Sequence, residues 1–121
     1  MTVEQLIDRY CEAWSLPAAG ARAAALAEVW GEDARYTDPG ADVTGATALL
    51  AHIDSVLASY PGARVERTSR VDLRHGVARF AWQMVLADGR RLPEGLDIAH
   101  LSTDGTRIAS IVGFFGALKA R

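Results

Sequence analysis

Residues 30–39 read WGEDARYTDP and lie at the boundary between two kinds of sequence. Upstream of them apolar residues recur at helical spacing, and Gly31 suits the position just after the end of a helix. The segment 34–38 has the residue types of a short strand, and Pro39-Gly40 ends it. This stretch therefore predicts that the chain changes from helix to strand here.

Helical signals surround this boundary. Thr2 and Gln5 form a capping box, which predicts a helix that begins there and ends by residues 15–16. An alanine-rich helix is expected over about residues 18–30, and a third helix over about residues 46–59, before Pro61-Gly62. Three helices are thus expected in the first half of the chain.

The second half has the pattern of strands. Three turn signals divide residues 63–116 into four pieces of strand length: His75-Gly76, Asp88-Gly89 and Asp104-Gly105. Such a series predicts an antiparallel meander of long strands. Three helices followed by a meander indicate an α+β fold, and a chain of 121 residues is expected to form a single domain over residues 1–121.

The faces of the last strand suggest a partner. Alternation places Ile108 and Phe114 on one face and Ile111 and Phe115 on the other, so both faces are apolar. A sheet with one face in water should alternate apolar and polar residues. We therefore expect the outer face of the sheet to form an interface, most simply that of a homodimer.

Composition excludes several classes of protein. Half of the residues are hydrophobic and the net charge is −2, which excludes general disorder and gives no affinity for nucleic acid or for an anionic membrane. The Arg-rich stretch 64–79 contains Glu66 and Asp72, which indicates a salt-bridged surface. Without a membrane-spanning run or a signal-peptide pattern, a cytoplasmic protein is expected.

Motifs for cofactors and metals are absent from the sequence. There is no Gly-rich phosphate loop, no HExxH and no CxxC, and the single cysteine, Cys11, forms no internal disulfide. We therefore expect neither a cofactor nor a metal.

Four ionisable side chains stand among apolar ones, and each has a structural and a catalytic interpretation. Tyr10 is either a core tyrosine or a phenol that donates a hydrogen bond to a substrate. Asp38, before Pro39, either shapes a turn or acts as a general base. Asp97 either faces water or is a carboxylic acid kept neutral by its apolar surroundings. His52 is either a satisfied core residue or a catalytic helper. The expected apolar pocket walls are Trp14, Trp30, Phe80, Trp82, Met84 and Phe115.

The order of the elements and three sequence blocks resemble the nuclear transport factor 2-like superfamily, and in particular its ketosteroid isomerase-like and SnoaL-like branch. The blocks are Arg9–Trp14, Trp30–Pro39 and, near the end of the chain, Gly95–Asp97 with Gly113–Gly116. The resemblance covers residues 2–116. It implies a cone-shaped α+β barrel, in which three helices pack on a strongly curved, mainly antiparallel sheet around one deep pocket.

The resemblance also implies roles for site residues. Tyr10 matches the tyrosine of the ketosteroid isomerase oxyanion hole, and Asp38 matches the base. Asp97 matches the protonated acid only with a one-residue gap in the following hairpin, and the alternative gap places Ala99 there. Ile53 replaces a supporting tyrosine, so the network behind Tyr10 is expected to be absent or rebuilt around His52. SnoaL-like cyclases use an Asp/His pair, which Asp97 or Asp38 with His52 could imitate.

The leading hypothesis is therefore a cofactor-independent isomerase or cyclase that moves a proton on a small apolar carbonyl compound. Asp38 would be the base, Tyr10 and protonated Asp97 would hold the oxyanion, and His52 would be a helper or an alternative base. Two alternatives stay open at this point: a hydrolase or dehydratase that uses the same carboxylates, and a non-catalytic module for ligand binding or dimerisation.

Overall fold

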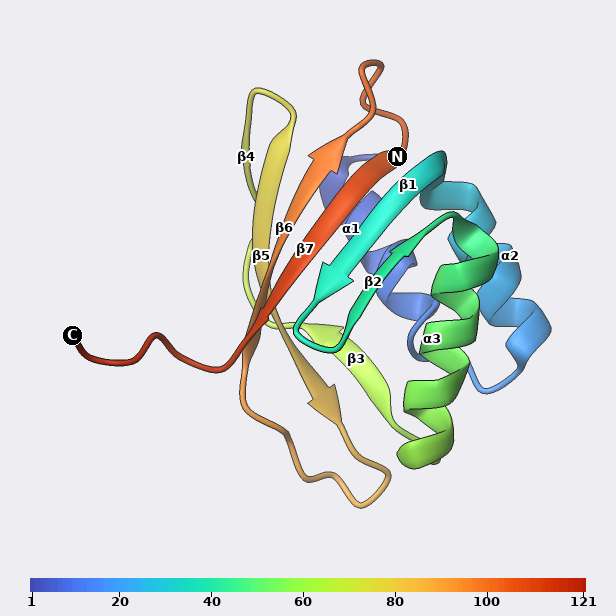
Figure 1. The fold of residues 1–121 in the computed structure, drawn as a ribbon, viewed down its shortest axis with the longest axis vertical. Coiled ribbons are helices and arrows are strands. Elements are labelled where there is room, and N and C mark those ends of the chain that lie inside the picture. The colour runs from blue at the N-terminus through green and yellow to red at the C-terminus, as the bar shows by residue number, and fades with distance from the viewer.

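The computed structural model describes residues 1–121, which form three helices and seven strands (Figure 1). The helices are α1 (Val3–Glu12), α2 (Ala19–Val29) and α3 (Ala46–Ser59). The strands are β1 (Trp30–Asp38), β2 (Ala41–Thr44), β3 (Arg64–Arg67), β4 (Asp72–Arg74), β5 (Val77–Val85), β6 (Gly95–Leu101) and β7 (Ile108–Phe115). The predicted α+β class is confirmed.

The strands form one mixed sheet in the order β2-β1-β7-β6-β5-β3, with β4 beside β5. Every pair is antiparallel except β1 with β7, which run parallel. The sheet curls, and the three helices pack against one of its faces (Figure 1). The expectation of an antiparallel meander thus holds from β5 to β7, but the last strand then returns to the first half of the chain.

Helix α1 begins as predicted and ends early. Thr2 and Gln5 form the capping box, with distances of 3.1 Å and 2.8 Å between side chain and backbone. The helix ends at Glu12 rather than at residues 15–16, because hydrogen bonds of the i to i−3 type tighten the chain over residues 13–15. The hydroxyl of Ser15 also donates to the carbonyl of Cys11, at 2.7 Å.

Strand β1 is longer than the sequence predicted. It starts at Trp30, immediately after α2, and Gly31 lies inside it rather than beyond the end of a helix. Its register with β7 shifts between Trp30 and Arg35, and Asp33 has a φ of +59°. This irregular segment interrupts the alternation of polar and apolar residues that would have revealed a strand.

Two further differences concern strand number. Pro39-Gly40 ends β1 after Asp38 as predicted, but an additional strand, β2, follows the turn and pairs with β1. The first of the four expected pieces of the second half is divided into β3 and β4, which both pair with β5. The three predicted turns are confirmed, and both residues of His75-Gly76 have positive φ, which suits a tight hairpin.

A register shift in β7 corrects the prediction about its faces. Leu101 pairs with Ile108 while His100 pairs with Ser110, so one residue of β7 is left over. Ile108 and Ile111 therefore both point into the core, where each is fully buried. The outer face keeps Val112 and Phe114, so it is apolar only in its last part.

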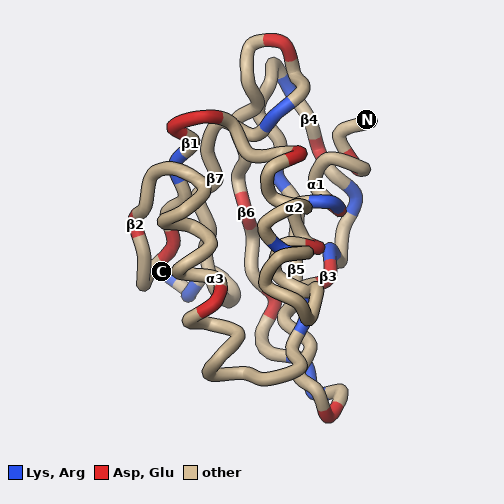
Figure 2. The backbone as a smooth tube through the Cα atoms, turned by 90° about the vertical axis from the view of Figure 1, so that its right-hand side faces the viewer, with Lys and Arg blue, Asp and Glu red and all other residues tan.

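Charged residues of both signs are scattered over the surface (Figure 2). The arginines of the basic stretch pair with acids, Arg64 with Glu66 and Arg79 with Asp72, at 2.8 Å and 2.9 Å. This is the salt-bridged surface that the sequence indicated. None of the helices has the length and apolar composition needed to cross a bilayer.

Candidate active site

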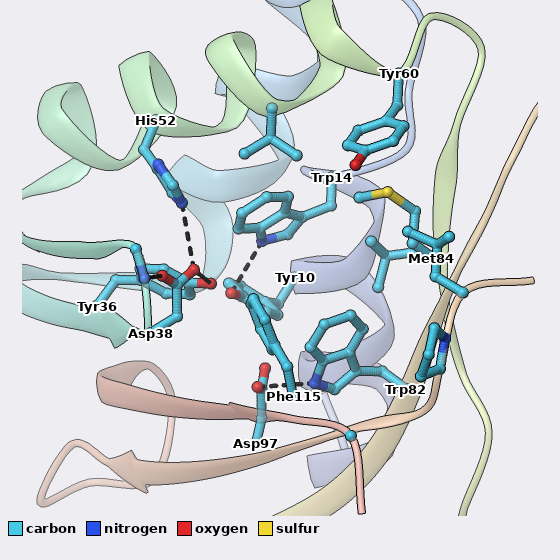
Figure 3. A pocket seen from close by; sticks show the side chains of 16 residues that line it. Tyr10, Trp14, Tyr36, Asp38, His52, Tyr60, Trp82, Met84, Asp97 and Phe115 are labelled. Atoms are coloured by element: carbon cyan, nitrogen blue, oxygen red, sulfur yellow. Dashed lines mark hydrogen bonds and ion pairs between the residues drawn. The ribbon is translucent and has the colours of Figure 1, made fainter.

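A cavity of about 550 Å³ lies between the sheet and helices α1 and α3 (Figure 3). No lysine or arginine lines it. The lining residues are Tyr10, Trp14, Tyr36, Asp38, Gly40, His52, Val56, Tyr60, Val65, Trp82, Met84, Leu92, Pro93, Asp97, Phe115 and Gly116. The volume is typical of a small-molecule site, and the polar groups among largely apolar walls are typical of one that orients its ligand.

Helix α1 contributes the phenol of Tyr10, which is 2 % exposed. One turn later, the indole Nε1 of Trp14 donates a hydrogen bond to the Tyr10 hydroxyl oxygen at 2.9 Å. Burial raises the pKa of Tyr10 well above 10, so the group stays a neutral phenol. Tyr10 accordingly belongs both to the core and to the pocket wall.

Strand β1 ends in Asp38, whose carboxylate accepts three hydrogen bonds. The Tyr36 hydroxyl donates to Oδ2 at 2.6 Å and the Gly40 backbone N–H donates to Oδ1 at 2.7 Å. His52 Nε2 lies 3.3 Å from Oδ2. Asp38 thus shapes the turn before β2 and also lines the pocket, so its two interpretations are compatible. Burial, together with the hydrogen bond to Asp38, raises the pKa of Tyr36 and keeps that phenol protonated.

Strand β6 contributes Asp97, which is 5 % exposed and lines the pocket. Its single hydrogen-bond donor is the Trp82 indole, 2.8 Å from Oδ1. Burial raises the pKa of Asp97 to about 7, the hydrogen bond from Trp82 opposes this, and the charge of Asp38 adds to it. The carboxyl group therefore carries a proton for a large part of the time near neutral pH.

Gly113 explains how two carboxyl groups come to face one pocket. It lies on β7, between the strands that carry Asp38 and Asp97, and it pairs directly with Asp97. A Cβ at this position would meet Asp97 Oδ1 at 2.8 Å and the Cβ of Asp38 at 3.7 Å. Only a residue without a side chain leaves the two carboxyl groups room to share this row of the sheet.

The gap position left open by the sequence can now be compared with the structure. Asp97 faces the cavity, whereas Ala99 pairs with Ile111 and is fully buried in the core. Of the two candidate positions, Asp97 is therefore the one that lines the cavity.

His52 points from α3 towards Asp38 (Figure 3). Its ring also stands edge-on to Trp14, with centroids 5.8 Å apart. The prediction that the network behind Tyr10 is absent or rebuilt around His52 is wrong, because Trp14 bonds to Tyr10 while His52 serves Asp38. The donor to Tyr10 comes from the turn after α1 and not from α3.

The predicted pocket walls divide into two groups. Trp14, Trp82, Met84 and Phe115 line the cavity. Trp30 and Phe80 do not: Trp30 stacks on the far side of Tyr10, and Phe80 is 1 % exposed in the core. Strand alternation correctly placed Phe80 on the inner face, but it could not show that other core residues cover its side chain.

Further lining residues were missed by the sequence reasoning. Tyr36 is two residues before Asp38 on β1, so strand alternation could have placed both on one face. Leu92 and Pro93 lie in the connection from β5 to β6, where no periodicity exists to find them. Val56, Tyr60 and Val65 complete the missed group.

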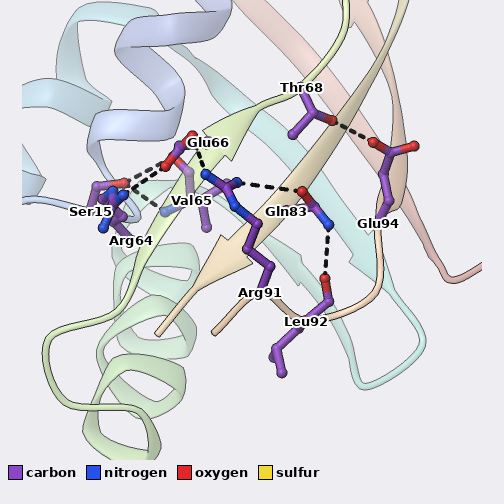
Figure 4. Close-up of polar contacts among 9 residues, drawn as sticks. All are labelled: Ser15, Arg64, Val65, Glu66, Thr68, Gln83, Arg91, Leu92 and Glu94. Atoms are coloured by element: carbon purple, nitrogen blue, oxygen red, sulfur yellow. Dashed lines mark hydrogen bonds and ion pairs between the residues drawn. The ribbon is translucent and has the colours of Figure 1, made fainter. Parts of the chain in front are cut away.

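The connection before β6 forms one lip of the pocket and is held from outside (Figure 4). Gln83 Nε2 donates to the Leu92 carbonyl at 3.2 Å. The Arg91 guanidinium reaches Glu66 at 3.3 Å and Gln83 at 3.4 Å. These contacts fix Leu92 and Pro93 over the cavity.

The structure contains no cluster of three or more His, Cys, Asp or Glu side chains that could hold a metal ion.

Comparisons with known proteins identify a family and structures of the same fold. The sequence model of the SnoaL-like domain matches residues 7–111. No curated protein matches the chain significantly. Among solved structures, a candidate isomerase of the SnoaL-like family from Agrobacterium tumefaciens is 28 % identical, with a TM-score of 0.86 over 93 % of this chain and 96 % of that one.

Two more distant structures share the fold. A candidate ketosteroid isomerase from Kribbella flavida is 20 % identical, with a TM-score of 0.68 over 97 % of this chain and 79 % of its own. An NTF2-like protein of unknown function from Cytophaga hutchinsonii is 11 % identical, with a TM-score of 0.68 over 95 % and 90 % of the two chains.

Proposed function

The chain belongs to the SnoaL-like domain family, and we propose that it is an isomerase or cyclase that transfers a proton on a small apolar carbonyl compound without a cofactor. One observation carries this proposal. Two carboxyl groups face one apolar pocket across Gly113, and their surroundings differ: Asp38 accepts three hydrogen bonds, whereas Asp97 accepts one and burial raises its pKa to about 7. Paired acids whose surroundings separate their protonation states are typical of acid–base catalysis.

The residues have the following roles. Asp38, as the carboxylate, removes a proton from the carbon beside the carbonyl, and the electron pair of that C–H bond forms the enolate. Tyr10 and protonated Asp97 donate hydrogen bonds to the enolate oxygen. The proton on Asp38 then returns to another carbon, which completes an isomerisation. Alternatively, the enolate carbon attacks a second carbonyl, whose oxygen takes the proton from Asp38, and this completes a cyclisation. His52, bonded to Asp38, is a helper or an alternative base.

The walls define the substrate class. With no lysine or arginine in the lining, the pocket offers no permanently charged cation to a carboxylate or a phosphate. Its aromatic and aliphatic walls favour a neutral compound with few polar groups, such as a ring ketone.

Exchange of ketone α-protons for deuterium tests the proposal. Proton NMR follows a panel of ring ketones in D₂O with the wild-type protein and with Asp38→Asn. We expect the variant to lose about 10²–10⁴-fold in exchange rate, because an amide cannot accept the proton. Asp42→Asn is the matched control, since Asp42 is exposed and pairs with Arg35 outside the pocket. Wild-type exchange by a folded Asp38→Asn protein would remove Asp38 as the base.

A second candidate function is favoured by the contact between Asp38 and His52. At 3.3 Å the pair could activate a water molecule, which would make the protein a hydrolase or dehydratase. Oxygen-18 from the solvent entering the product separates this reaction from isomerisation. A purely binding module is disfavoured, because Asp97 does not face water and Tyr10 bonds a side chain rather than the backbone.

The outer sheet face supports a homodimer. Leu96 and Phe114 pair across β6 and β7 and are 38 % and 52 % exposed, while Arg35 and Arg79 on the flanking strands are charged. An apolar patch beside charged residues is common at protein interfaces, and a second copy of the chain is its simplest partner. Analytical ultracentrifugation should find a dimer that Phe114→Asp converts to a monomer. A cytoplasmic location stays a prediction from sequence.

A further inference from the structure

The three tryptophans of the chain use their indole N–H groups differently. Trp14 donates to the Tyr10 hydroxyl at 2.9 Å, and Trp82 donates to Asp97 Oδ1 at 2.8 Å. The buried Nε1 of Trp30 has no hydrogen-bond partner, although its ring stacks on Tyr10 with centroids 5.9 Å apart. Two of the three indoles therefore donate to Tyr10 and Asp97, the two groups that hold the substrate oxygen in the proposed function.

We propose that Trp14 and Trp82 are positioning residues, each of which occupies an acceptor site on one acid so that both hydroxyl hydrogens point to the substrate oxygen. This inference rests on the proposed function for its catalytic meaning. The geometry that it describes can be tested without any substrate.

The chemistry of the indole decides the argument for Tyr10. An indole N–H can only donate, so the phenol oxygen must be the acceptor in its contact with Trp14. The O–H hydrogen of Tyr10 is then left for another partner. Trp14 follows Tyr10 by four residues, in the tightened turn after α1, which holds the two rings on the same side. The free hydrogen therefore faces the cavity that both residues line.

The same reasoning applies to Asp97. Its Oδ1 accepts from Trp82, so in the neutral acid the proton resides on Oδ2. Trp82 can reach Asp97 only because its cross-strand neighbour is Gly95: a Cβ there would lie 2.4 Å from the indole ring. Phe115 closes the other side, edge-on to Trp82 with centroids 5.4 Å apart. Sequence and packing thus hold this indole in one place.

Few other groups influence Asp97. The titratable groups near it are Tyr10 and Cys11 on α1, Tyr36 and Asp38 on β1, and His52 on α3, which is bonded to Asp38. No arginine or lysine lines the pocket, so Trp82 is the group that stabilises the ionised form of Asp97. Removing the indole N–H of Trp82 should raise the pKa of Asp97 further. The O–H group of protonated Asp97 would also lose its fixed orientation.

The test uses three matched substitutions, Trp14→Phe, Trp82→Phe and Trp30→Phe, each of which removes one indole N–H and keeps an aromatic ring. Carbon-13 NMR of labelled aspartate side chains follows the carboxyl titration of Asp97 in each variant. We expect Trp82→Phe to raise the midpoint by about one pH unit or more, as the loss of a hydrogen bond to a charged group implies. Trp14→Phe and Trp30→Phe should leave it unchanged.

Ketone exchange kinetics add a second readout. In Trp82→Phe, kcat/KM should fall about tenfold to a hundredfold on its plateau, while its alkaline limb moves to higher pH. A purely structural loss would lower the plateau without moving the limb. Trp14→Phe should lower the plateau alone, because it acts on Tyr10. The control Trp30→Phe should change neither, because its N–H donates to nothing.

An Asp97 midpoint that is the same in Trp82→Phe as in the wild-type protein would overturn the inference. This result is independent of turnover, so it is distinguishable from failure of the proposed function, which would appear as a lack of ketone exchange with a normal titration. Should Trp82→Phe fail to fold, Gly95→Ala provides the second variant, because its new Cβ forces the indole away from Asp97. The same rise of the midpoint is expected there, and an unchanged midpoint would again overturn the inference.

Discussion

Asp38 and Asp97 occupy neighbouring regions of one pocket and are served by different numbers of hydrogen-bond donors. The Asp38 side chain and the residue Asp97 are each 5 % exposed. At the end of β1, donors come from an adjacent side chain, from the backbone of the turn and from α3. In the middle of β6 the backbone groups are engaged in the sheet, and a single indole reaches the carboxyl group.

The difference shows that burial alone does not fix the role of a carboxyl group. A buried charge is tolerated where enough donors compensate for the water it has lost, and otherwise the group keeps its proton. A turn supplies free N–H groups, whereas a central strand has none to spare. The place of each aspartate in the fold thus favours a base at Asp38 and an acid at Asp97.

After the loss of the base Asp38, the largest effect on turnover is expected from removing the acid, Asp97. Asp97→Leu should lose about 10²–10³-fold in kcat, because one donor to the enolate oxygen is gone. Asp97→Asn should stay within about tenfold of the wild-type protein, since an amide N–H also donates. Rates of ketone exchange from pH 5 to pH 9 measure both, and the alkaline limb should disappear in the asparagine variant. An Asp97→Asn protein as inactive as Asp38→Asn would contradict the role of Asp97 as a hydrogen-bond donor that an amide can replace.

A second prediction concerns stability and pH. The pKa of Asp97 is raised by folding from 3.8 to about 7, so its contribution to stability is complete below about pH 4 and is lost as the pH rises through about 7. The free energy of unfolding of the wild-type protein, minus that of Asp97→Asn, should therefore fall over this range, by up to about 4 kcal/mol. Urea unfolding at a series of pH values measures it. A constant difference would mean that Asp97 is ionised in the folded protein at acidic pH.

The smallest effect is expected from a donor to Asp38. Tyr36→Phe removes the hydroxyl that lies 2.6 Å from Oδ2, and the carboxylate keeps its other two donors. We expect a loss of about 1–3 kcal/mol in the free energy of unfolding at neutral pH. Tyr60→Phe is the control, because this side chain is 42 % exposed at the pocket wall and should cost little. Equal losses in the two variants would contradict the view that Asp38 depends on its donors.

Local sequence signals predicted much of the fold. The capping box, the third helix over residues 46–59 and the three hairpin turns all act within a few residues, so they can be identified without knowledge of the rest of the chain. The resemblance carried by the block 30–39 was sufficient for the family. By contrast, the start of β1 was missed, because a bulged segment does not alternate, and the four-residue strand β2 was missed as well.

The sequence predicted which residues form the candidate site better than it predicted the hydrogen bonds between them. Tyr10, Asp38, His52 and Asp97 were identified as polar residues in apolar surroundings, and all four line the cavity. Trp14 and Trp82 were expected only as apolar walls, since their N–H groups find partners through the turn after α1 and through the gap at Gly95. Trp30 and Phe80 are aromatic too and were predicted as pocket walls for the same reason, but packing buries them in the core, where they do not line the cavity.

The sequence by itself determined the helices, most of the strands and the apolar character of the pocket, because side-chain type and short-range periodicity are properties of neighbouring residues. It left open whether Asp97 faces water or the pocket. Only the tertiary structure decided that Asp38 and Asp97 meet over Gly113. That row depends on the parallel pairing of β1 with β7, which joins residues more than sixty positions apart in the chain. Register between distant strands follows from packing of the whole sheet, and no local pattern encodes it.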